Sequence, residues 1–137
     1  MYTRGQGKHQ SNPEMVNWYQ KAAKQKNVFA QFALGIMYQF GRGTYQSYSE
    51  AVKWYEKAAK KGYSPAQYNL GWMFAKGRGV NRSYSEAVKC YLEAAKRGHV
   101  KAQKVLGWMY RDGHGVHQNI PEAIKWHRRA AESEYRG

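Results

Sequence analysis

The stretch LGWMFAKGRGV, residues 70–80, joins a helical run to a loop that contains two glycines. The same landmarks return at a constant offset of 36 residues on both sides of it. The Leu-Gly pair stands at 34–35, 70–71 and 106–107, and the loop glycines stand at 5/7, 41/43, 77/79 and 113/115. Self-similarity at such a period is typical of a repeat architecture, in which each unit packs on its neighbours. The chain is therefore predicted to be an array of 36-residue units.

One helix of each unit is exemplified by EAVKWYEKAAKKG at residues 50–62, where apolar residues recur at helical spacing with lysines on the other face. Such helices are preceded by Ser or Asn with Glu three residues later, which is the pattern of a capping box. The four copies are Ser11 with Glu14, Ser47 with Glu50, Ser83 with Glu86, and Asn119 with Glu122. Gly62 and Gly98 are predicted to end two of these helices with a left-handed residue, and Asn27 to do so in the preceding unit.

A second helix is predicted from SPAQYNLGWMFAK, residues 64–76, with Pro65 as its first residue and an apolar stripe that includes Leu70 and Met73. Gly71 lies in the middle of this helix, where glycine costs about 1 kcal/mol relative to alanine. We interpret Gly71 as a point where a neighbouring helix approaches too closely for a side chain.

The glycine-rich loop at 77–80 has two readings, a phosphate cradle or a turn between helices. A P-loop follows a strand and leads into a helix, whereas this loop follows a helix and precedes the cap at Ser83. Its middle residue also changes from Arg to His between copies. We therefore predict a turn. The alternative is that Arg42, Arg78 and Lys76 line one rim and contact an anion there.

The repeated pattern Ala-x3-Leu-Gly-x-Met-Tyr/Phe-x2-Gly-x-Gly-Val, followed by Glu-Ala-x2-Trp-Tyr-x2-Ala-Ala, resembles the Sel1-like repeat, a relative of the tetratricopeptide repeat. The resemblance implies an all-α, right-handed α-solenoid of antiparallel helix pairs that scaffolds protein–protein interactions without catalysis or cofactor. One domain, 1–137, is expected, with a partial unit 1–27 and units 28–63, 64–99 and 100–135. The first Met-Tyr pair is in phase with later copies, so the chain is expected to begin inside a unit. Two alternatives stay open: the first helix of that unit is genuinely missing, or the chain is a piece of a longer array. Departures are Thr44 for Val, Cys90 for Trp, His127 for Tyr, and Ser133-Glu134 where Gly is expected.

The helices that begin near Val28, Ser64 and Val100 are expected, from the resemblance, to line the concave side of the solenoid. Their exposed positions form a predicted partner-binding groove with aromatics at one end and cations at the other. The candidate residues are Phe32, Ile36, Phe40, Tyr68, Trp72, Lys76, Lys101, Lys104, Trp108 and Arg111. Tyr, Trp and Arg are the residues that most often anchor interfaces, and Arg and Lys suit carboxylates. The alternative is that Trp72 and Trp108 are core residues that pack on the next unit.

Charge keeps a second class of partner open. The chain carries 23 Lys+Arg and 9 Asp+Glu, a formal net charge of +14, which attracts acidic proteins, nucleic acids and anionic membrane surfaces. Nucleic-acid binding would use a basic helical face, whose candidates are Lys53, Lys57, Lys60, Lys61, Lys125, Arg128 and Arg129. On the simpler reading these are solvated faces, with some lysines paired to Glu56 or Glu93. Oligomerisation through the terminal units is also possible, since exposed ends of a repeat array normally need a polar cap.

Catalytic and metal sites find little support. His114, His117 and Asp112 lie close in sequence, but zinc normally takes three or four protein ligands and His99 belongs to the other end of the helix. Cys90, the single cysteine, is expected to be buried and inert rather than reactive. No apolar run reaches the length of a membrane span, and MYTRGQGKHQ lacks the apolar segment of a signal peptide. The sequence does not indicate a cell compartment.

Overall fold

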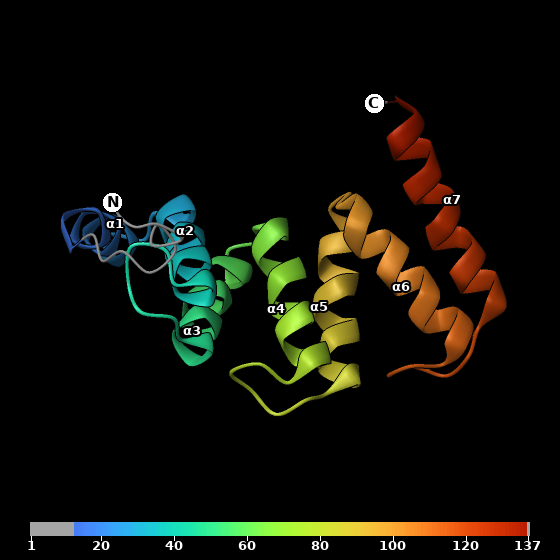
Figure 1. The fold of residues 1–137 in the computed structure, drawn as a ribbon. Helices are drawn as coiled ribbons and strands as arrows, with labels where there is room; N and C mark the ends of the chain where they lie inside the picture. Colours follow the sequence, from blue (N-terminus) through green and yellow to red (C-terminus); the bar gives the residue numbers. More distant parts are fainter. Residues whose placement is uncertain (1–12, 137) are drawn as a thin grey trace, which may run out of the picture.

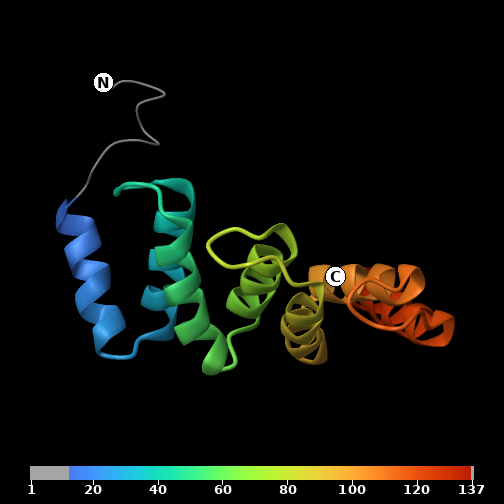
Figure 2. The ribbon, with the colours of Figure 1, turned by 90° about the horizontal axis from the view of Figure 1, so that it is seen from below.

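The computed structural model describes residues 13–136, which form seven α-helices and no strand. The helices are α1 (Pro13–Lys24), α2 (Val28–Phe40), α3 (Tyr48–Lys60), α4 (Ser64–Lys76), α5 (Tyr84–Lys96), α6 (Val100–Asp112) and α7 (Ile120–Arg136). Each helix packs against its neighbours in the chain, most extensively within the pairs α2/α3, α4/α5 and α6/α7. The helices follow one another along the molecule, with α1 and α7 at opposite ends (Figures 1 and 2). The predicted all-α solenoid is confirmed.

Small side chains let the helices approach closely. Several alanines have no exposed surface, including Ala51 of α3, Ala66 of α4 and Ala102 of α6. Larger side chains, such as the fully buried Tyr55 and Met73, fill the spaces between helices. The core therefore runs along the array as layers of alanine between a few large residues, as expected where each unit contacts only its neighbours.

Mid-helix glycines mark the tightest contacts. A Cβ atom on Gly71 would lie 2.9 Å from the Tyr91 ring, and one on Gly35 would lie 2.4 Å from the Tyr55 ring. In the third copy, Gly107, the added atom would lie 2.7 Å from Nε2 of His127. These distances are shorter than van der Waals contact, so the interpretation of Gly71 as a point of close helix approach is confirmed.

Of the two hydrogen bonds in each predicted capping box, the structure forms the one that the cap side chain accepts. Oxygen atoms of Ser47, Ser83 and Asn119 accept hydrogen bonds from the backbone N–H three residues later, at 3.2, 3.2 and 3.1 Å. The backbone N–H of each cap residue donates to a carbonyl of the preceding helix, at Tyr38, Phe74 and Tyr110 respectively. The glutamate of the box is therefore left to pair with a lysine three residues on, as Glu50 does with Lys53. Ser11, the fourth predicted cap, lies outside the described residues.

Two predicted helix boundaries are wrong by one residue. The left-handed residue after α1 is Lys26, with φ 71°, and not Asn27. Asn27 is instead the N-cap of α2, where its Oδ1 accepts from the N–H of Ala30 at 2.9 Å. Lys26 is the position that aligns with Gly62 and Gly98, both of which have positive φ as predicted. In α4 the first residue is Ser64 rather than Pro65, which occupies the second position.

The loop after α4 is a turn, as predicted. Gly77 caps α4 in the left-handed conformation, with φ 66°. Gly79 also has positive φ, and a Cβ there would lie 2.5 Å from the carbonyl oxygen of Tyr48. The loop thus folds back onto the start of α3, in the preceding unit. Gly115 makes the equivalent approach to the carbonyl of Tyr84.

Candidate binding surface

Two adjoining hollows lie on one side of α4, and we call them the Trp72 hollows. The larger, of about 340 Å³, is lined by Tyr68, Trp72, Ala75, Lys76, Tyr84, Tyr91, Val105, Met109 and His114. The smaller, of about 280 Å³, is lined by Gln39, Phe40, Tyr68, Asn69 and Trp72. Tyr68 and Trp72 belong to both, so their rings form the ridge between the hollows. The surface therefore extends from α2 across α4 to α6.

Four of the ten predicted binding residues line these hollows: Phe40, Tyr68, Trp72 and Lys76. The other six do not. Phe32 packs on the rings of Tyr55 and Tyr63, and Ile36 packs against the core.

The remaining predicted residues lie on α6. Lys101 is exposed, while Lys104 is ion-paired with Glu134. Arg111 donates from Nε and Nη2 to Asp112 at 2.9 and 3.2 Å. The cationic end of the predicted groove is thus partly neutralised by local carboxylates.

The two tryptophans have different surroundings. Trp72 is half-buried and packs against the core, while its ring also lines both hollows. Trp108 is 47% exposed and has its ring 6.0 Å from that of His127. Core packing and hollow lining are therefore compatible for Trp72.

Residues from the loops complete the surface, and the helical pattern gave no sign of them. Tyr84 stands at the start of α5, and its ring lies 5.5 Å from that of His114. His114 is brought there because the loop after α6 folds back onto Tyr84. The repeated glycine at 115 was the available signal, since it could have indicated contact between loop and preceding unit.

Burial shapes the chemistry of Tyr68 and its neighbour His99. Burial raises the pKa of the Tyr68 hydroxyl, which therefore stays protonated. The imidazole of His99 stacks on the Tyr68 ring with centroids 4.8 Å apart. Its pKa is lowered by burial and, to a lesser extent, by Lys101. Among the described residues, the lining of the Trp72 hollows contains no carboxylate, and its one fixed cation is Lys76.

Within the described part of the chain, two of the seven cations of the predicted basic face form ion pairs within their own helix. Lys53 and Lys125 pair with Glu50 and Glu122, three residues earlier. The expected pairing of lysines with Glu56 or Glu93 is wrong, because within residues 13–136 neither forms an ion pair. The first-turn glutamates take the nearby lysines instead.

The arginines and lysines at the loops and outer helices also face aromatic rings. Arg42 lies over Phe40 at 5.1 Å and Arg78 over Tyr48 at 5.3 Å. Lys57 and Arg129 lie over Trp54 and Trp126, at 5.9 and 5.0 Å. Arg42, Arg78 and Lys76 remain exposed, so contact with an anion at this rim stays a prediction.

Cys90 is half-buried, and its pKa is raised to about 12 by burial and by the charges of Glu86, Glu56 and Glu93. The thiol therefore stays protonated near neutral pH, as expected for an inert cysteine. Residues 13–136 contain no group of three or more His, Cys, Asp or Glu side chains placed to hold a metal ion. Over the same residues, none of the helices is both long enough and apolar enough to span a membrane.

Comparison with known proteins gives one family. The family model described as Sel1 repeat matches residues 1–27, 28–63, 64–99 and 100–135. Comparison with curated proteins gives no match.

Two bacterial structures are similar in sequence and fold. One is c5321, a protective antigen of uropathogenic Escherichia coli displaying an SLR fold, with 40% identity and a TM-score of 0.83 over 85% of this chain and 25% of that one. The other is a Sel1 repeat protein from Oxalobacter formigenes, with 37% identity and a TM-score of 0.79 over 88% of this chain and 52% of that one. This chain thus spans about a quarter and about half of their lengths.

Cysteine rich protein B of Helicobacter pylori shares the fold at 19% identity, with a TM-score of 0.69 over 88% of this chain and 86% of that one.

Proposed function

Because this chain belongs to the Sel1 repeat family, whose members are generally protein–protein interaction scaffolds, we propose that it is a non-catalytic scaffold whose Trp72 hollows bind a peptide segment of a partner protein. The segment would present an apolar or aromatic side chain with carboxylates beside it. The observation that carries the proposal is the lining itself. Aromatic rings dominate it, Lys76 is its fixed cation, and no carboxylate is present among the described lining residues.

An aromatic floor with one cation suits this ligand for two reasons. Burial of an apolar side chain on Phe40, Tyr68 and Trp72 contributes about 25 cal/mol for each Å² removed from water. Lys76 is exposed at the rim and attracts a carboxylate, while the absence of a neighbouring carboxylate avoids repulsion. The hollow therefore selects for charge and shape together.

The test uses three synthetic peptides, Glu-Glu-Trp-Glu-Glu, Lys-Lys-Trp-Lys-Lys and Glu-Glu-Ala-Glu-Glu, titrated into isotopically labelled protein and followed by NMR. We expect the acidic tryptophan peptide to shift the signals of Tyr68 and Trp72 and to bind more weakly to Lys76→Glu. Lys96→Glu is the matched control, since Lys96 is also an exposed lysine at the end of a helix but does not line either hollow. The proposal would be refuted if the alanine peptide caused equal signal shifts, or if both variants lost affinity for the acidic tryptophan peptide to the same extent.

Binding of nucleic acid or another polyanion through a basic helical face is the alternative, favoured by the formal net charge of +14. Such binding should fall steeply with rising salt and should not depend on Trp72. A duplex oligonucleotide that still bound tightly at about 200 mM salt would reverse the order of the two proposals. Affinity capture with and without nuclease separates the same alternatives for natural partners.

Assembly through a terminal unit is a further part of the proposal. Ile124 of α7 is 46% exposed, whereas Val52 and Val88, at the equivalent position in α3 and α5, are each 5% exposed. We expect the side of α7 that exposes Ile124 to support self-association. Light scattering across a concentration series tests it, and a monomer at every concentration would exclude it.

A further inference from the structure

A repeated pairing of an aromatic ring with a cation is broken in one unit. Four equivalent positions follow one another at intervals of 36 residues. Three of them are tryptophan, Trp18, Trp54 and Trp126, and the remaining one is Cys90. The residue three positions later is Lys21, Lys57 or Arg129 after the tryptophans, but Glu93 after the cysteine. The Cys90 unit therefore lacks both the indole and the cation.

In two of the three tryptophan units, those of Trp54 and Trp126, the structure shows the ring and the cation together, whereas Trp18 is 65% exposed. Trp126 is 2% exposed, with the guanidinium of Arg129 5.0 Å from its ring centroid. Trp54 packs against the core, with the ammonium of Lys57 5.9 Å from its ring. The indole fills the space between helices, and the cation covers its face.

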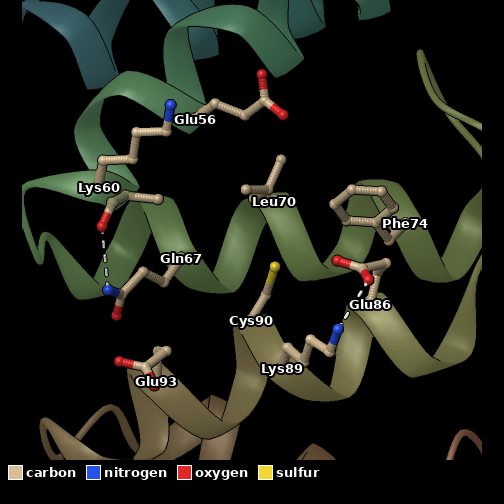
Figure 3. Close-up of a pocket in the computed structure, with 10 residues that line it drawn as sticks. Glu56, Lys60, Gln67, Leu70, Phe74, Glu86, Lys89, Cys90 and Glu93 are labelled. Carbon is tan, nitrogen blue, oxygen red and sulfur yellow. Dashed lines mark hydrogen bonds and ion pairs between the residues drawn. The ribbon is translucent and has the colours of Figure 1, made fainter.

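At Cys90 this space is open. A hollow of about 290 Å³ lies between α3 and α5, with Leu70 and Phe74 of α4 and the Cys90 sulfur at its floor (Figure 3). We call it the Cys90 hollow. Leu70 and Phe74 are each two residues from Trp72, about 200° around the helix, so this hollow and the Trp72 hollows lie on opposite sides of α4.

The rim of the Cys90 hollow is more acidic than the chain as a whole. Glu56, Glu86 and Glu93 line it, together with Lys60 and Lys89 (Figure 3). Lys89 is already paired with Glu86 at 3.1 Å. Within the described residues Glu56 and Glu93 form no ion pair, so two carboxylates remain for an incoming cation.

A buried acceptor also lines the Cys90 hollow. The Nε2 of Gln67 donates to the carbonyl of Ala59 at 3.2 Å, while its Oε1 has no hydrogen-bond partner although the residue is only 5% exposed. The corresponding oxygens of Gln31 and Gln103 are also unpaired, in the units that carry Trp54 and Trp126. Gln67 is the one of the three that lines the hollow beside a cysteine in place of a tryptophan.

We propose that the Cys90 hollow is a docking site for a basic partner segment that inserts an aromatic side chain and places a lysine or arginine beside it. The segment would supply, from another molecule, the ring and the cation that the other units supply from their own helix. Its ring packs on Leu70, Phe74 and the Cys90 sulfur. Its cation meets Glu56 and Glu93. Binding of this charge is opposed by the overall +14 of the chain, so it would report the local site rather than general attraction.

The test again uses NMR titration with defined peptides at low salt. We expect Lys-Lys-Trp-Lys-Lys to shift the side-chain amide of Gln67 and the backbone amide of Cys90. Lys-Lys-Ala-Lys-Lys should leave both unchanged. Glu-Glu-Trp-Glu-Glu should also leave them unchanged, which separates this site from the Trp72 hollows.

Two variants restore what the other units contain. Cys90→Trp fills the hollow with the residue of the three equivalent positions, and Glu93→Lys returns the cation of Lys57. Each should weaken binding of the basic tryptophan peptide about tenfold or more. Glu93 is exposed, so Glu93→Lys stays informative even if Cys90→Trp fails to fold, as judged by circular dichroism. Unchanged binding in both folded variants, or shifts that do not require the tryptophan, would overturn the proposal.

Discussion

His99 provides a pH-dependent helix cap whose effect on stability is measurable. As the N-cap of α6, its Nδ1 accepts a hydrogen bond from the backbone N–H of Ala102 at 3.2 Å. A protonated imidazole has no acceptor nitrogen, so the cap exists only in the neutral form. Burial and Lys101 both lower the pKa of His99, which favours that form in the folded protein.

The sign of the pH dependence follows from the direction of this shift. In the unfolded chain histidine takes up a proton as pH falls below about 6.5. The folded state resists protonation, so the unfolded state binds more protons in this range and stability rises with pH. The stabilisation is fully present above the unfolded pKa and is lost as pH falls through the lowered folded pKa. Since a side-chain N-cap contributes about 1 kcal/mol, the expected loss is about 4 °C in melting temperature for a domain of this size.

The assay compares wild type with His99→Asn by thermal denaturation between about pH 7.5 and pH 5. Asparagine is the right replacement because Asn27 already caps α2 at the equivalent position, accepting from Ala30 N–H at 2.9 Å. An asparagine cap does not titrate in this range, and the other histidines are common to both proteins. The difference in melting temperature should therefore shift in favour of the variant as pH falls. Parallel curves would refute the pH-linked cap, and a shift of opposite sign would mean that stacking of the imidazolium on Tyr68 outweighs it.

Two further predictions concern stability alone. Gly71→Ala should lower the free energy of unfolding, measured in urea, by about 1–3 kcal/mol. The added methyl group would lie 2.9 Å from the buried Tyr91 ring, and this overpacking exceeds the gain in helix propensity. A more stable variant would contradict the close-approach interpretation. Ser83→Ala should cost about 1 kcal/mol by circular-dichroism melting, because it removes the acceptor for the Glu86 N–H. The control is Ser85→Ala: the Ser85 hydroxyl is exposed and lies 3.1 Å from that of Ser83, but it accepts no backbone N–H of the described residues. Equal losses of stability in the two variants would argue against the cap.

Helix positions were predictable because their signals are local and repeated. Ser47 and Ser83 cap as the motif indicates, since the bond joins atoms only three residues apart. The error at Asn27 arose because asparagine tolerates both the left-handed conformation and the N-cap position. The 36-residue register places Lys26, not Asn27, opposite Gly62, and the position rather than the residue type determined the conformation.

The reciprocal half of each capping box could not be predicted from local sequence. It depends on whether the N–H of the cap residue is free to donate to the carboxylate of Glu50 or its equivalents. In the folded chain that N–H donates to a carbonyl of the preceding helix, as Ser47 does to Tyr38 at 2.8 Å. Tertiary contact thus replaced a local interaction that the motif alone indicated.

The candidate binding surface was predictable only along single helices. Phe40, Tyr68, Trp72 and Lys76 were found because they share the exposed side of α2 or α4. His114 was missed because it reaches the hollow through a loop that folds back onto the preceding unit.

Local pairing also changes which cations are available for binding. Arg111 is bonded to its neighbour Asp112, and Lys104 pairs with Glu134, which lies 30 residues away in the sequence. Spacing along α6 identifies the cations but not these partners.

Repetition also explains how one array can present different surfaces on opposite sides of α4. Each unit is held by contacts with its immediate neighbours, so a change on an outer helix alters the local surface without disturbing distant units. Replacing an indole by the thiol of Cys90 leaves α5 in register, with Tyr91 still packed at Gly71. The net charge of the chain acts over about a Debye length and cannot distinguish the two sides. Under the two proposals, the side chains of each hollow select its partner: Lys76 with aromatic rings on one side of α4, and Glu56 with Glu93 on the other.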